Sequence, residues 1–77
     1  MSQWDKLMAR LKNLSTDMRI EELAKILERC GYVRSGGKGS HAVFRKQGFR
    51  PVVIPDHRPL KVQYIRMVRD IVEKEGM

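Results

Sequence analysis

The sequence contains a single cysteine, Cys30, among 77 residues. One cysteine excludes an intramolecular disulfide, and its place in an apolar helical pattern predicts a small core residue. Long apolar runs are also missing, since the longest aliphatic run in the predicted sheet region is Val52-Val53-Ile54. A membrane-spanning helix needs roughly 20 apolar residues, so none is predicted. Because no segment resembles a signal peptide, we expect a protein of the reducing cytoplasm that does not enter a membrane.

Groupings of catalytic or metal-binding residues are equally scarce. Cys30, His41 and His57 have none of the spacings of a zinc centre. The predicted sheet region has no paired carboxylates, and no acid is placed to orient an imidazole in a catalytic triad. The glycine-rich segment around Lys38 lacks the spacing of a Walker loop. We therefore expect no metal and no small-molecule cofactor.

Acidic residues are rare in the middle of the chain. Between Arg29 and Arg69, ten lysines or arginines stand against one acid, Asp56, within a formal net charge of +7. Such a field attracts nucleic acid, an acidic protein or an anionic membrane surface. The membrane is the least favoured of the three, because neither the hairpin nor either loop shows an exposed apolar stripe. A chain this short has no room for a deep cavity, so a polymer bound at its surface is the expected ligand.

Hydrophobic periodicity predicts a single α+β domain with the order α-α-β-β-β-α. Apolar series from Trp4 to Leu14 and from Ile20 to Cys30 predict two helices, with a break at the capping and turn residues 13–17. Gly31 is expected to end the second helix. The predicted strands and last helix cover residues 32–35, 40–46, 49–54 and 60–74. We expect a three-stranded antiparallel sheet with helices packed on one face and the other face open.

The alternation of the middle strand then assigns its side chains to the two faces. Ala42 and Phe44 are apolar and are expected to pack against the helices. His41, Val43 and Arg45 must therefore project from the open face.

His41 is the strongest candidate for chemistry. It follows a basic glycine loop, residues 36–40, whose backbone amides can approach a phosphate, with Lys38 and Ser40 adding donors. An imidazole titrates near neutrality and can take the proton from a 2′-hydroxyl of RNA, which then attacks the adjacent phosphorus. Lys38 or Arg45 would stabilise the charge on the phosphoryl oxygens. The alternative is a histidine without a catalytic role that is either simply exposed or hydrogen-bonded for structural reasons.

His57 is the other imidazole and lies in the turn after the third predicted strand. It is either an auxiliary general acid or phosphate contact, or a solvated turn residue beside Asp56 and two prolines.

Three stretches together resemble the HicA toxins of bacterial toxin–antitoxin systems. They are residues 20–33, Lys38-Gly39-Ser40-His41 with Phe44-Arg45, and Ile54-Pro55-Asp56-His57. The resemblance covers about residues 20–75. The chain departs from the family pattern at Ala42, at the opening of the last helix, and in an extra N-terminal segment, residues 1–17.

The resemblance implies a double-stranded-RNA-binding-like fold for one domain, residues 1–77, with an extra N-terminal helix in residues 1–17 and a core in residues 18–77. It also implies that His41 is the catalytic histidine of a ribosome-independent mRNA endonuclease, which we expect to work without a metal. A HicB antitoxin that covers the active face is the implied protein partner. The expected RNA-binding residues are Lys38, Gly39, Ser40, Arg45 and Lys46.

Three functions remain open at this point. The first is an endoribonuclease toxin acting through His41. The second is a non-catalytic module that binds structured RNA through the same basic face, and the third is a protein-interaction domain that docks an acidic partner.

Overall fold

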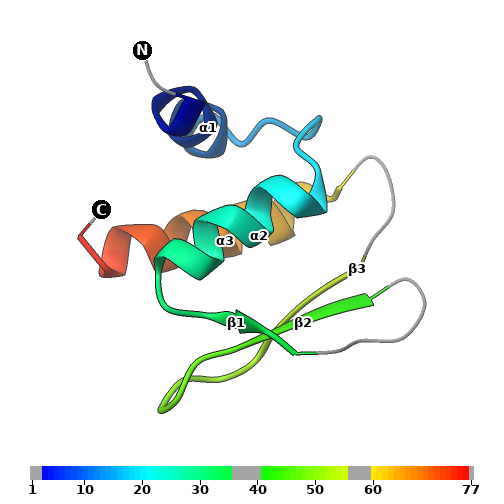
Figure 1. Cartoon of the computed structure of the whole chain (residues 1–77). Coiled ribbons are helices and arrows are strands. Elements are labelled where there is room, and N and C mark those ends of the chain that lie inside the picture. Colours follow the sequence, from blue (N-terminus) through cyan, green and yellow to red (C-terminus); the bar gives the residue numbers. More distant parts are fainter. Residues whose placement is uncertain (1–2, 36–40, 56–59, 77) are drawn as a thin grey trace.

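The computed structural model describes residues 3–35, 41–55 and 60–76. Its elements are α1 (Gln3–Lys12), α2 (Ile20–Arg29), β1 (Val33–Arg34), β2 (His41–Arg45), β3 (Val52–Pro55) and α3 (Val62–Lys74). The strands form one antiparallel sheet in the order β1-β2-β3. Helices α2 and α3 cover one face of this sheet, and α1 packs on the far side of these two helices (Figure 1). The predicted α+β class and element order are confirmed, and the arrangement is compatible with a double-stranded-RNA-binding-like fold.

The sheet register places the apolar side chains of β2 and β3 opposite each other. Ala42 pairs with Ile54, and Phe44 pairs with Val52. These four side chains are buried under the helices, as period-two alternation requires for a sheet covered on one face. The third strand begins later than predicted, at Val52. Pro51 precedes it and has no N–H to donate to a ladder.

The turn between β2 and β3 is closed by a backbone hydrogen bond. The Phe49 N–H donates to the Lys46 carbonyl at 3.0 Å, and Gly48 has a φ of 83°. A positive φ at the third residue of such a turn favours glycine. The predicted turn at Gln47-Gly48 is therefore present.

Gly31 ends α2 as predicted. Its φ is 97°, its N–H donates to the Glu28 carbonyl, and the Tyr32 N–H donates to the Leu27 carbonyl, both at 3.0 Å. This pair of bonds is the Schellman pattern, which satisfies carbonyls left open at the helix end. The chain turns here from the helix layer into the sheet and buries Tyr32.

The first helix ends where the turn residues 13–17 predict a break, although Leu14 of the apolar series lies beyond its end. It ends at Lys12, and Leu14 adopts a φ of 55°, with the Ser15 N–H donating to the Arg10 carbonyl at 3.1 Å. Leu14 is nevertheless half-buried and packs against the core. Its apolar side chain was thus predicted to face the core correctly, but its backbone is not helical.

An arginine fastens α1 to the start of α2. The Arg10 guanidinium pairs with Glu22 and, at 3.2 Å, with Asp17. The hydrogen bond from Arg10 is the main cause that lowers the pKa of the Asp17 carboxyl. Glu22 also accepts the Arg19 backbone N–H at 2.8 Å, so one carboxylate serves both the helix start and the helix–helix contact.

The core lies between the helices and the sheet and extends up to α1. Its buried apolar side chains are Met8, Leu11, Met18, Ile20, Leu23, Ala24, Ile26, Leu27, Cys30, Tyr32, Ala42, Phe44, Val52, Ile54, Leu60, Ile65, Val68 and Val72. Burial raises the pKa of the Cys30 thiol, in agreement with a core role. No helix in the described part of the chain is long and apolar enough to cross a membrane.

The burial of α1 yields a stability prediction. Leu11 is fully buried, so Leu11→Ala should lower the free energy of unfolding by about 2–5 kcal/mol through lost transfer energy and the cavity left behind. Urea denaturation followed by circular dichroism measures this loss. Lys12→Ala, at an exposed position of the same helix, is the control. Equal stability of the two variants would show that α1 is not part of the cooperative core.

Candidate nucleic-acid interface

Strand β2 presents His41, Val43 and Arg45 on the face of the sheet turned away from the helices. His41 and Arg45 are exposed and Val43 is half-buried, whereas the alternating Ala42 and Phe44 have no exposed surface. The structure thus has the alternation that the sequence predicts. An imidazole and a guanidinium stand on one open surface.

Cross-strand pairing arranges this open face in three rows. The rows are Val33 beside Arg45, Ser35 beside Val43 and Val53, and His41 beside Pro55. Val33 is 66% exposed and Val53 is 45% exposed, so the face has an apolar middle. The expectation that the hairpin shows no exposed apolar stripe is therefore wrong, because the register brings these valines together only in the folded sheet. None of these seven residues is acidic, and the groups that bear or can acquire positive charge are His41 and Arg45.

Arg45 is held in place by a neighbour from β1. Its Nε donates to the Ser35 Oγ at 3.1 Å. Because Ser35 lies in the middle row, this bond draws the guanidinium from its own row toward that of His41. The Cα atoms of these two residues are about 13 Å apart at the usual strand rise. The hydrogen bond therefore brings the positive charge closer to the imidazole than the strand spacing alone would.

Lys46, a predicted RNA-binding residue, lies elsewhere. Its Nζ pairs with Glu75 of the chain end that follows α3. The same ammonium lies 4.5 Å from the Phe49 ring centroid and 5.6 Å from that of Tyr32. Lys46 thus points to the helix side, and the structure does not bring it together with His41 and Arg45.

The remaining predicted site residues, Lys38, Gly39, Ser40 and His57, lie outside the described residues. Their neighbours in the chain are nevertheless placed. His41 follows residues 36–40 directly, Pro55 precedes residues 56–59, and His41 pairs with Pro55. The described residues that border these two gaps, His41 and Pro55, are therefore paired at one end of the sheet.

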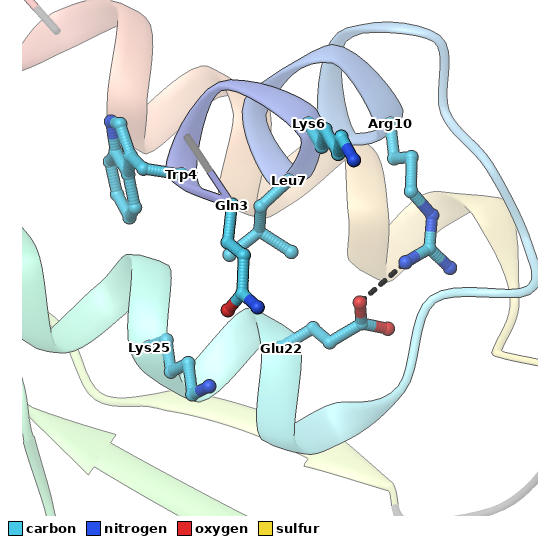
Figure 2. A pocket seen from close by; sticks show the side chains of 7 residues that line it. All are labelled: Gln3, Trp4, Lys6, Leu7, Arg10, Glu22 and Lys25. Atoms are coloured by element: carbon cyan, nitrogen blue, oxygen red, sulfur yellow. Dashed lines mark hydrogen bonds and ion pairs between the residues drawn. The ribbon is translucent and has the colours of Figure 1, made fainter. Parts of the chain in front are cut away.

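A hollow of about 390 Å³ separates α1 from α2 on the other side of the molecule. Its lining residues are Gln3, Trp4, Lys6, Leu7, Arg10, Glu22 and Lys25. Figure 2 shows Glu22 reaching up from α2 to Arg10 of α1. This guanidinium is already paired, and the helix layer separates the hollow from the open face of the sheet. We therefore assign the hollow no part in the chemistry of His41.

The sequence alone predicted the three residues of β2 on the open face but not their neighbours on the flanking strands. Val33, Ser35 and Val53 complete the surface. The signal that would have found them is the alternation of β1 and β3 combined with the pairing register. Within residues 3–35, 41–55 and 60–76, no three His, Cys, Asp or Glu side chains are grouped as metal ligands.

The arrangement provides one group that can transfer a proton and one fixed cation on a surface free of acids.

Comparison with protein families gives a match over residues 20–74 to the family described as HicA toxin of bacterial toxin-antitoxin. The comparisons with curated proteins and with solved structures found no match. The matched segment contains α2, the whole sheet and α3, whereas α1 lies outside it. Since the match spans most of the chain, the protein belongs to the HicA family of toxins.

Proposed function

We propose that this protein is the toxin of a type II toxin–antitoxin system and that it cleaves mRNA as a ribosome-independent, metal-independent endoribonuclease. The observation that carries the proposal is the exposed His41 on the acid-free open face, in a chain that belongs to a toxin family. His41 is the catalytic residue. Arg45 and the loop residues Lys38, Gly39 and Ser40 bind the phosphate groups of the substrate.

The reaction is an attack of RNA on its own backbone. The His41 imidazole accepts the proton of a 2′-hydroxyl, and the 2′-oxygen forms a bond to the adjacent phosphorus. The bond from phosphorus to the 5′-oxygen breaks, and that oxygen takes a proton from water or from His57 as auxiliary acid. The products are a 2′,3′-cyclic phosphate and a 5′-hydroxyl.

Arg45 supports this step electrostatically. Negative charge on the phosphoryl oxygens grows as the 2′-oxygen attacks, and a fixed cation stabilises such charge. The Ser35 hydroxyl orients the guanidinium, so little reorganisation is needed during the reaction. Lys46 is committed to Glu75 on the helix side, and we therefore leave it out of the phosphate site.

A HicB-type antitoxin that covers the active face is the partner we propose. The exposed valines in positions 33 and 53 leave an apolar middle on the open face, and apolar patches of this kind mark protein interfaces. Carboxylates of an antitoxin would complement His41 and Arg45 beside it. One partner can thus bury the valines and block the imidazole together.

Replacement of the histidine tests the mechanism. His41→Ala removes a proton-transfer group that typically contributes about 10² to 10⁴ in rate, so cleavage of an RNA substrate should fall by that factor. Inducible expression in bacteria should arrest growth and fragment mRNA for the wild type but not for His41→Ala. Lys12→Ala is the control and should behave as the wild type. Cleavage retained by a folded His41→Ala protein would contradict the proposal, and RNA binding without cleavage by the wild type would favour the non-catalytic module.

A cleavage assay with a chelator, followed by analysis of the product ends, tests whether the mechanism works without a metal. Cleavage of a labelled RNA in excess chelator should proceed at the rate measured with magnesium, because the imidazole supplies the proton transfer itself. Mass spectrometry of the fragments should show 2′,3′-cyclic phosphate ends. A strict requirement for magnesium, or 5′-phosphate ends, would exclude this mechanism.

A further inference from the structure

A second surface lies at the other end of the sheet, where the β2–β3 turn meets the end of α3. It is a hollow of about 350 Å³. Phe49, Val52, Met67 and Ile71 contribute apolar side chains to it. A hollow of this size and lining admits one large apolar side chain.

Lys46 holds the two walls of this hollow together. Its ammonium pairs with Glu75 at the end of the chain and lies 4.5 Å from the Phe49 ring centroid. The Tyr32 ring lies 6.4 Å from that of Phe49, at a tilt of 57°. Phe49 itself is 56% exposed. An aromatic ring is thus fixed at the edge of the hollow by contacts within the protein.

The charge around the hollow is positive. Glu75 is the one acid among its lining residues, and Lys46 pairs with it. Arg50 and Lys74 also line the hollow, are exposed, and form no ion pair with any carboxylate in the described part of the chain. The surface therefore combines an apolar floor with two cations at its rim.

These features favour a protein segment over RNA. A base stacks on an open aromatic face, and Lys46 already covers one of the two faces of the Phe49 ring. The floor is instead made of aliphatic and methionine side chains, which suit an apolar anchor residue. Acidic residues beside that anchor would complement Arg50 and Lys74.

The hollow is also remote from the proposed catalytic residue. Lys46 follows the last residue of β2, whereas His41 is the first, and the usual strand rise puts their Cα atoms about 17 Å apart. A partner bound at the hollow therefore need not touch the imidazole.

We propose that this hollow docks an acidic segment of the cognate antitoxin, which inserts one large apolar side chain between the β2–β3 turn and α3. The inference rests on the toxin role proposed above but not on RNA cleavage. It gives the antitoxin a second point of attachment, separate from the open face of the sheet.

Two variants test the docking. Arg50→Glu/Lys74→Glu reverses the charge at the rim of the hollow, and Phe49→Ala removes the aromatic ring at its edge. Isothermal titration calorimetry with the purified antitoxin encoded beside this toxin should show a Kd that rises by about 10-fold or more for each variant. Lys12→Glu/Lys25→Glu makes the same change in net charge at exposed positions elsewhere and should bind the antitoxin with nearly the wild-type Kd. Circular dichroism establishes that every variant is folded.

The outcomes separate this inference from the proposed function. Phe49→Ala should cleave RNA at the wild-type rate, since it leaves the open face and the net charge unchanged. Arg50→Glu/Lys74→Glu should cleave at the rate of the control variant, which has the same net charge. A Kd equal to that of the control variant, for either hollow variant, would overturn the docking proposal. It would also be overturned if RNA binding weakened while the antitoxin Kd stayed constant, because the hollow would then contact RNA. Failure of the proposed function would appear elsewhere, as cleavage by His41→Ala.

Discussion

The burial of Phe44 in the middle of β2 is the constraint on which the rest of the structure depends. Its ring has no exposed surface and packs under the helices with Ala42. Because strand side chains alternate, fixing these two on the inner face forces His41 and Arg45 onto the outer face. A slip of one residue in the pairing would bury the imidazole and expose the phenyl ring, so the core defines the orientation of the candidate catalytic group.

The two faces of the sheet have different roles in the molecule. The inner face and the helices provide stability, and α1 adds Leu11 to this core from outside the segment that the HicA family shares. The outer face carries His41, the catalytic residue that we propose, and has an apolar middle. A small toxin that cleaves RNA, as proposed here for this protein, must expose its reactive group to a polymer and also offer a surface that an antitoxin can cover. An open sheet with His41 at its end satisfies both requirements without a deep cavity.

The sequence predicted the features that depend on local periodicity. Helical spacing located the three helices, Gly31 located the end of α2, and strand alternation placed His41 on the open face. Features that depend on pairing between distant residues were not predictable in this way. Lys46 was predicted to bind RNA beside Arg45 because the two residues are adjacent in the sequence. Its side chain instead pairs with Glu75, 29 residues further along the chain. The exposed valines likewise form a surface only when the register of the strands is known, and the φ of 55° at Leu14 contradicts the preference of a bulky residue.

The most direct test of the account is to locate bound RNA on the two faces. A short single-stranded RNA with a 2′-deoxy nucleotide at the scissile position cannot be cleaved, so it can be titrated into the wild-type protein labelled with ¹⁵N. The account predicts the largest changes in amide chemical shift at His41, Val43, Arg45 and Val53, with those of α1 unchanged. Changes confined to α1 and α2, with the open face of the sheet unaffected, would contradict it.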